Sequence, residues 1–165
     1  MTDSEMMQLS ARLGERLVQR GATLTTAESC TGGWIAKVLT DIPGSSAWFE
    51  RGFVTYSNAA KSDMIGVQPA TLDTWGAVSE QVVREMAIGA LQAAGADYAV
   101  SVSGIAGPDG GSTAKPVGTV WFGFASQSGS TQARVQQFTG DRESVRRQSV
   151  VYALETVGQL FLQNT

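Results

Sequence analysis

The stretch DYAVSVSG, residues 97–104, is apolar, aromatic or small at every position after its opening aspartate. A continuous run of this kind is typical of strands in sheets that helices cover on both faces. The residues before it, 79–95, place apolar side chains on one helical face, and a glycine-rich loop, 105–118, follows it directly. The stretch therefore predicts a buried central strand of an α/β sheet, with a loop at its carboxyl end.

The rest of the chain supplies the other elements of an α/β sandwich. Helical spacing also extends over residues 2–21, which begin with the capping-box pair Thr2 and Glu5, and over residues 141–161. We expect shorter helices over 30–44 and 58–67, and strands over 22–29, 47–57, 119–126 and 131–140. The last two strands are so close in sequence that they predict a β-hairpin, which brings one antiparallel strand into the sheet.

The expected fold class is α/β, a three-layer α/β/α sandwich with a mixed, mostly parallel sheet of about five strands. A length of 165 residues fits one such unit, so residues 1–165 are expected to form a single domain. In sheets of this class, ligands bind at the carboxyl ends of the parallel strands. Two polar stretches fall at such ends, ESCTGG (28–33) and SGIAGPDGG (103–111).

Composition argues against several kinds of partner. The net charge of −3 disfavours a broad nucleic-acid-binding surface. Nowhere does an apolar run approach the roughly 20 residues that cross a bilayer. One cysteine cannot form a disulfide within the chain, so nothing indicates an oxidising compartment. We therefore expect a soluble, cytoplasmic protein with neither a nucleic-acid nor a membrane partner.

The sequence contains no histidine. This excludes Ser-His-Asp and Cys-His catalytic groups, as well as the usual histidine-ligated zinc sites. The single cysteine also excludes cysteine-rich metal clusters. We therefore expect no metal and no cofactor, and any hydrolase activity needs a base of another type.

The ESCTGG motif places Ser29 where a predicted strand meets the next helix. The main-chain N–H groups of Cys30, Thr31, Gly32 and Gly33 open that helix and are predicted to face an anion or a developing oxyanion. If the site catalyses no reaction, the same N–H groups would simply bind a phosphate, and the serine would be an ordinary N-cap. The motif alone therefore does not separate an enzyme from a binding module.

Lys61 is the candidate base, because a lysine shielded from water loses its proton near neutral pH and then accepts one from a serine. It lies in the stretch YSNAAK (56–61), which begins with Tyr56. Taken singly, the lysine also fits a solvated helix position, and the tyrosine fits core packing. The spacing leaves both interpretations open.

The second loop and the last helix offer further contacts for a polar ligand. Ser103, Gly104 and Gly107 belong to the SGIAGPDGG stretch, which also fits a long turn. Three arginines lie near the start of the last predicted helix: Arg142, Arg146 and Arg147. A phosphate there would meet the helix dipole and guanidinium donors, although a solvated helix face would carry the same residues. We take Arg142 and Arg146 as candidate substrate contacts.

Six ordered blocks resemble the CinA carboxy-terminal domain family: TTAESCTGGW, RGFVTYSNAAK, GAVSE, SGIAGPDGG, PVGTVWFGFA and GDRESVRRQ. The resemblance covers nearly the whole chain, and the length is similar to that of the stand-alone members, the nicotinamide-nucleotide amidohydrolases. It implies hydrolysis of the carboxamide of nicotinamide mononucleotide to nicotinate mononucleotide and ammonia, a step in NAD recycling. It also implies the three-layer fold and a metal-free reaction.

The resemblance also assigns roles to single residues. Ser29 would be the nucleophile, Lys61 the base, and Tyr56 would assist proton transfer or hold the oxyanion. Cys30 would contribute its main-chain N–H. The substrate would be a small-molecule nucleotide, and we expect the chain to form a homo-oligomer, a dimer. The alternative is a catalytically silent module that binds a nucleotide or sugar phosphate on the same scaffold.

Overall fold

The computed structural model describes residues 1–163, and its centre is a sheet with the strand order β2-β1-β3-β4-β5. The strands are β1 (Leu24–Glu28), β2 (Phe53–Val54), β3 (Tyr98–Gly104), β4 (Thr119–Ser126) and β5 (Thr131–Gln137). β1 pairs in parallel with both β2 and β3, whereas β4 is antiparallel to both β3 and β5. The mixed, mostly parallel sheet is therefore confirmed, and β4 is the strand that runs against the others.

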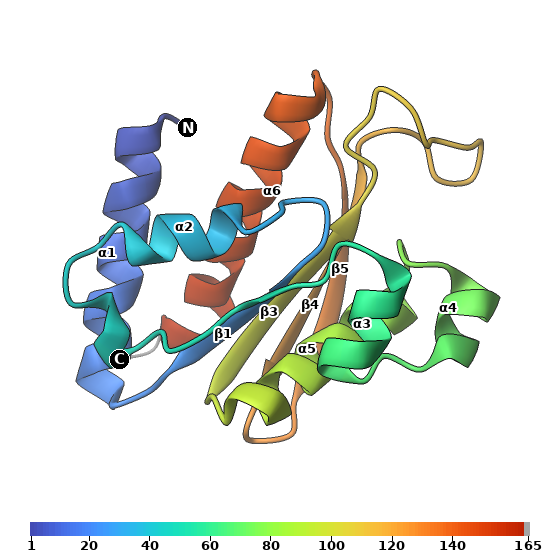
Figure 1. The fold of residues 1–165 in the computed structure, drawn as a ribbon. Coiled ribbons are helices and arrows are strands. Elements are labelled where there is room, and N and C mark those ends of the chain that lie inside the picture. The colour runs from blue at the N-terminus through green and yellow to red at the C-terminus, as the bar shows by residue number, and fades with distance from the viewer. Residues whose placement is uncertain (164–165) are drawn as a thin grey trace.

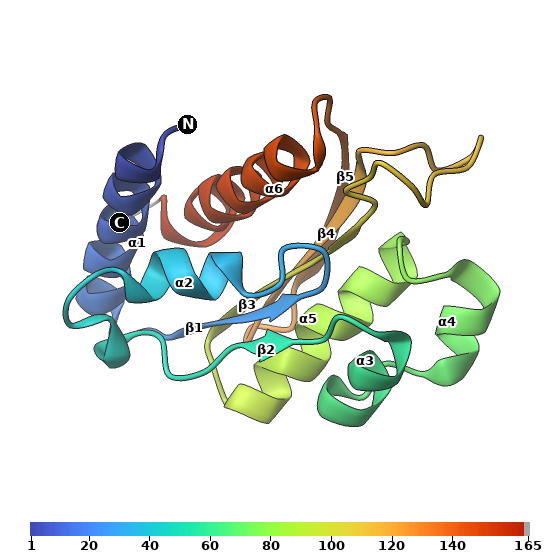
Figure 2. The same cartoon turned by 45° about the horizontal axis from the view of Figure 1, so that its top comes forward.

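Helices cover both faces of this sheet (Figure 1). The helices are α1 (Asp3–Arg20), α2 (Trp34–Thr40), α3 (Asn58–Ile65), α4 (Pro69–Trp75), α5 (Glu80–Ala94) and α6 (Arg142–Val157), with short turns η1 (Ser45–Ala47) and η2 (Gly158–Leu162). Figure 2 shows α1, α2 and α6 on one face and α3, α4 and α5 on the other, which confirms the three-layer sandwich. Within residues 1–163, no helix combines the length and the apolar character needed to cross a membrane.

Local sequence signals account for the long helices. The Thr2 hydroxyl accepts from the Glu5 N–H, the Glu5 carboxylate accepts from the Thr2 N–H, and α1 ends at Gly21 in the left-handed conformation. α5 likewise begins at the N-cap Ser79 and ends at a left-handed Gly95. The predicted ends of both helices are thus confirmed, because capping side chains and glycines fix helix ends locally.

The layer of α3 and α5 packs unusually closely. A Cβ atom at Gly89 of α5 would lie 1.8 Å from the carbonyl oxygen of Ile65, the last residue of α3. Only glycine allows the two backbones to approach this closely. This contact holds α3 against α5, which packs on the sheet, and α3 carries Lys61.

Some segments differ from the sequence-based expectations. The helix expected over 30–44 begins only at Trp34, because Gly32 and Gly33 adopt positive φ angles of 58° and 100°. The strand expected over 47–57 shrinks to the two residues of β2. Helix α4 was not predicted, although Pro69 at its first position and Gly76 at its end are recognised helix signals.

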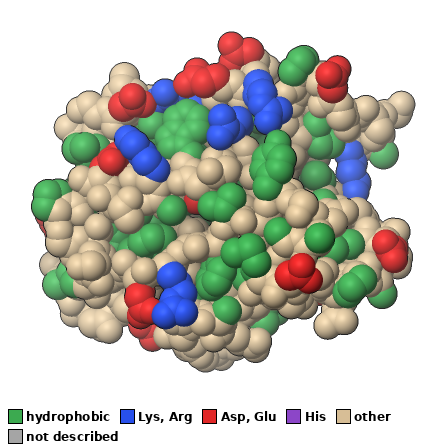
Figure 3. Space-filling model, in the orientation of Figure 1, with side chains coloured by type: hydrophobic (Ala, Val, Ile, Leu, Met, Phe, Trp, Pro, Cys, Tyr) green, Lys and Arg blue, Asp and Glu red, His purple; other side chains and the backbone are tan. Residues whose placement is uncertain are grey.

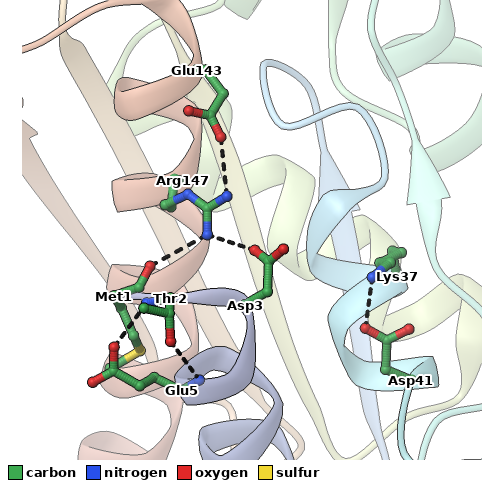
Figure 4. Close-up of polar contacts among 8 residues, drawn as sticks. All are labelled: Met1, Thr2, Asp3, Glu5, Lys37, Asp41, Glu143 and Arg147. Carbon is green, nitrogen blue, oxygen red and sulfur yellow. Dashed lines mark hydrogen bonds and ion pairs between the residues drawn. The ribbon is translucent and has the colours of Figure 1, made fainter.

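The start of the chain is fastened to α6 (Figure 4). The Arg147 guanidinium donates to the carboxylates of Asp3 at 2.7 Å and Glu143 at 3.0 Å, and to the carbonyl oxygen of Met1 at 3.3 Å. The Asp3 carboxylate in turn raises the pKa of Arg147. Arg147 therefore joins α1 to α6, away from any pocket at the strand ends.

Candidate active site

A pocket of about 260 Å³ lies at the carboxyl ends of β1 and β3. Its walls come from five segments of the chain: the turn after β1, the start of α3, the loop before α5, the end of β3 and the start of α6. The lining residues are Ser29, Cys30, Tyr56, Asn58, Lys61, Ala77, Val78, Ser103, Gly104, Ala106 and Arg142. The position agrees with the expectation that ligands bind at the ends of parallel strands.

Ser29 and Lys61 meet in this pocket. The Lys61 ammonium nitrogen lies 3.1 Å from the Ser29 Oγ, 3.0 Å from the carbonyl oxygen of Thr55 and 3.3 Å from that of Tyr56. The lysine is 1% exposed and the serine 8% exposed. Burial lowers the pKa of Lys61, because a charge shielded from water is costly. The serine is thus paired with a lysine that gives up its proton more readily than a solvated one.

Cys30 lines the same pocket, but its thiol is poorly suited to act as a nucleophile. Burial raises the pKa of Cys30 to about 11, so the sulfur stays protonated at neutral pH. Its main-chain N–H is different: within the described residues, neither this N–H nor that of Thr31 donates to a protein oxygen, and the Cys30 N–H contributes to the hydrogen bonding that opposes the rise in the pKa of its own thiol. These two N–H groups follow Ser29 directly in sequence and are the candidates for oxyanion stabilisation.

The carboxylate of Glu28 takes up most of the donors at the start of α2. It accepts from the Thr31 hydroxyl at 2.6 Å, the Ile35 N–H at 2.9 Å and the Ala36 N–H at 3.0 Å. The side chain is fully buried, which raises the pKa of Glu28, while these hydrogen bonds oppose that shift. Sequence reasoning missed this residue, although an acid inside a strand of buried residues is a signal.

Fewer main-chain N–H groups are available to bind an anion than the four that the sequence predicted. The Gly32 N–H donates to the Ser29 carbonyl oxygen at 3.0 Å, and the Gly33 N–H contributes to the hydrogen bonding that lowers the pKa of Glu28. Of the four N–H groups predicted to face an anion, those of Cys30 and Thr31 donate to no protein oxygen within residues 1–163. The protein's own carboxylate occupies the helix start, so the predicted set of four N–H groups is corrected to this pair.

Tyr56 and Arg142 form the rim of the pocket. The tyrosine side chain is 61% exposed, and its hydroxyl accepts from Arg142 Nη2 at 3.2 Å. Arg142 Nη1 also donates to the Gly107 carbonyl oxygen at 2.8 Å. Arg142 thus links the loop after β3 to the segment before α3, and the structure brings Gly107 to the site through its carbonyl.

The three candidate arginines have three different positions. Arg146 donates to the carbonyl oxygens of Cys30 at 3.0 Å and Thr31 at 3.1 Å, and its guanidinium lies 5.6 Å from the centre of the Trp34 ring. It supports the turn and is not among the residues that line the pocket, so its role as a substrate contact stays a prediction. Arg147 binds α1, and only Arg142 lines the pocket. Figure 3, drawn in the orientation of Figure 1, shows blue lysine and arginine side chains gathered toward the top of the molecule, beside green hydrophobic ones.

No metal centre is built into the described part of the chain, since residues 1–163 contain no group of three or more histidine, cysteine or acidic side chains placed to hold an ion.

The fold and the pocket define a class of protein: an α/β/α sandwich with a buried serine–lysine pair at the strand ends. Residues 6–161 match the family model described as the CinA C-terminal domain, and the chain belongs to this family.

Similar proteins are known by both sequence and structure. The chain is 70% identical, over the full length of both chains, to the nicotinamide-nucleotide amidohydrolase PncC of Escherichia coli strain K12. It is 57% identical to that of Pseudomonas putida, over 92% of this chain and 94% of the relative. The crystal structure of the competence/damage inducible protein CihA from Agrobacterium tumefaciens has a TM-score of 0.93 and 45% identity, over 97% of this chain and 96% of the other.

Proposed function

We propose that this chain hydrolyses the carboxamide of nicotinamide mononucleotide to nicotinate mononucleotide and ammonia, with Ser29 as nucleophile and Lys61 as base. The observation that carries the proposal is the 3.1 Å contact between the Lys61 nitrogen and the Ser29 oxygen inside the pocket. Relatives that are 57–70% identical along almost their whole length are named nicotinamide-nucleotide amidohydrolases, which supports the choice of substrate. The reaction recycles the nicotinamide nucleotide into the NAD pool.

The surroundings of Lys61 suit a neutral amine. A neutral amine has two N–H donors and one lone pair. The carbonyl oxygens of Thr55 and Tyr56 accept the two N–H groups, which leaves the lone pair directed at the Ser29 hydroxyl. In this state the contact reverses, and the serine donates to the lysine. The two carbonyls therefore orient the base toward the proton that it must remove.

The chemical steps follow from this geometry. Ser29 Oγ attacks the amide carbon while its proton passes to Lys61, and the oxyanion is stabilised by the N–H groups of Cys30 and Thr31. Lys61 then gives the proton to the leaving nitrogen, the C–N bond breaks, and ammonia departs. Water attacks the acyl-enzyme with Lys61 again as base, and the serine regains its proton as the carboxylate product leaves.

The rim residues are proposed to hold the nucleotide. Arg142 is the candidate for the 5′-phosphate, because a guanidinium offers several charge-assisted donors and two of its N–H groups already fix its position. Tyr56 contacts Lys61 through its carbonyl and Arg142 through its hydroxyl, so its part in proton transfer stays a prediction. The cytoplasmic location and the dimer also stay predictions.

The test is ammonia release from nicotinamide mononucleotide by the purified chain without added metal, compared with Ser29→Ala. We expect steady release by the unchanged chain, none by the variant, and a mass increase on Ser29 that corresponds to the acyl-enzyme when the reaction is stopped with acid. Binding of the mononucleotide with no ammonia would favour the silent binding module instead. The fold of the variant is checked by its melting temperature.

A further inference from the structure

We infer that Glu28 is a positioning residue of this active site, an inference that rests on the proposed function. Its buried carboxylate holds the turn that carries Ser29 and the two N–H donors. The side chain is 0% exposed and touches the turn through Thr31 and the start of α2 through Ile35 and Ala36. Glu28 therefore acts on the reaction through the residues that it fixes, without touching the substrate.

The Glu28 side chain accepts hydrogen bonds of 2.6 to 3.0 Å from Thr31, Ile35 and Ala36, and the Gly33 N–H also helps to oppose the rise in its pKa. One carboxylate oxygen accepts from the Thr31 hydroxyl and the Ile35 N–H, and the other accepts from the Ala36 N–H. An ionised carboxylate accepts at both oxygens, which matches this set; burial raises the pKa of Glu28, and these hydrogen bonds oppose that shift. Within the described residues, Glu28 forms no ion pair with lysine or arginine. Main-chain N–H groups and one hydroxyl therefore surround the carboxylate in place of an ion pair.

The main chain of Glu28 adds a second constraint. Its carbonyl oxygen accepts from the Thr55 N–H at 2.8 Å, and Thr55 in turn supplies a carbonyl oxygen to the Lys61 nitrogen at 3.0 Å. The same residue therefore connects the nucleophile turn to the segment that orients the base. A small rearrangement at Glu28 would move both partners, and a misplacement of about 1 Å costs on the order of 10²-fold in rate.

The decisive variant is Glu28→Gln, which keeps the size of the side chain. Its amide nitrogen would face an N–H or hydroxyl donor, so at least one of the three contacts is lost. We expect kcat for the mononucleotide to fall by about 10²-fold while KM stays within about threefold, because the affected groups act on the transition state. A matched control is Glu85→Gln: the Glu85 carboxylate accepts from the Gln68 N–H at 2.8 Å and the Thr71 hydroxyl at 2.7 Å, but caps α4 instead.

A second readout does not depend on the substrate. A fluorophosphonate reagent forms an O–P bond with an activated serine, fluoride leaves, and the serine proton passes to the base. We expect the unchanged chain to be labelled on Ser29, Glu28→Gln to be labelled about 10²-fold more slowly, and Glu85→Gln to retain the original rate. If the unchanged chain is labelled but releases no ammonia, the proposed substrate is wrong, and the labelling rates still decide the role of Glu28.

Several results would overturn the inference. Glu28→Gln could keep kcat and the labelling rate within about threefold. Alternatively, Glu85→Gln could lose as much activity as Glu28→Gln, which would mean that the loss comes from general destabilisation and not from the position of Glu28. Absence of labelling in the unchanged chain would overturn the inference together with the serine mechanism. If Glu28→Gln does not fold, Thr31→Val removes one donor and keeps the carboxylate. That variant should lose about tenfold in kcat with KM unchanged, and full activity would contradict the proposal.

Discussion

Replacing Lys61 by arginine keeps the positive charge but removes a group that gives up its proton near neutral pH. The Lys61 nitrogen is the only side-chain nitrogen or oxygen that contacts the Ser29 hydroxyl within residues 1–163. The pocket lining contains no carboxylate that could replace it. Arginine also extends beyond the position of the lysine nitrogen, into the space that Ser29 occupies. We therefore expect Lys61→Arg to be nearly as inactive as Lys61→Met.

The magnitude follows from the loss of the base. A positioned general base contributes about 10² to 10⁴-fold, and groups that act as a unit with a nucleophile lie at the upper end. We expect kcat/KM to fall by about 10³-fold or more in both variants, which corresponds to about 4 kcal/mol of transition-state stabilisation. The matched control is Lys37→Arg, because Lys37 is exposed and pairs with Asp41 on the surface.

Ammonia release from nicotinamide mononucleotide measures the effect, and its pH dependence tests the cause. Burial lowers the pKa of Lys61, so activity should rise with pH and level off below the ordinary lysine value of about 10.4. The unfolded chain binds this proton more tightly, so stability should also rise with pH between the lowered pKa and about 10.4. An arginine variant within tenfold of the unchanged chain would refute the role of Lys61 as base.

Three further outcomes are expected. Ser29→Ala should abolish ammonia release while Cys30→Ala keeps most of it, and a folded but inactive Cys30→Ala that binds ligand normally would reverse the assignment. Arg142→Ala should lower kcat/KM for the mononucleotide by about 10²-fold and leave nicotinamide riboside unchanged, whereas equal loss on both would separate Arg142 from the phosphate. Gly89→Ala should lower the melting temperature by about 5 °C or more, since its Cβ would lie 1.8 Å from the Ile65 oxygen, and an unchanged melting temperature would contradict that packing.

The fold could be predicted from the sequence because its signals are local. Caps such as Thr2 and Ser79 fix helix ends through contacts within a few residues, and β3 is recognisable from its apolar run. The hairpin between β4 and β5 predicted that one strand would be antiparallel, and the register confirms it. Helix α4 was missed because seven residues carry too few apolar positions for a clear pattern.

The site was harder to predict, because its important contacts join residues far apart in sequence. The sequence offered Ser29 and Lys61 as candidates, but only the packing of α3 on the sheet brings their side chains to 3.1 Å. The arginines of α6 could not be sorted by spacing, since Arg142 and Arg146 are four residues apart and share one helix face, yet only Arg142 lines the pocket. Glu28 was overlooked because the burial of a carboxylate and its pairing with N–H groups are tertiary features.

The hydrogen bonds from Arg146 to the turn after β1 affect how strongly the Thr31 N–H donates. In a trans peptide group the C=O and N–H bonds point in opposite directions, so the guanidinium that binds the Cys30 carbonyl lies on the side away from the Thr31 N–H. A cation at the oxygen draws electron density through the amide, which makes the hydrogen on the nitrogen more acidic. Arg146, 116 residues from Cys30 in sequence, therefore makes the Thr31 N–H a stronger hydrogen-bond donor through the peptide bond, as a remote substituent raises the acidity of an organic acid.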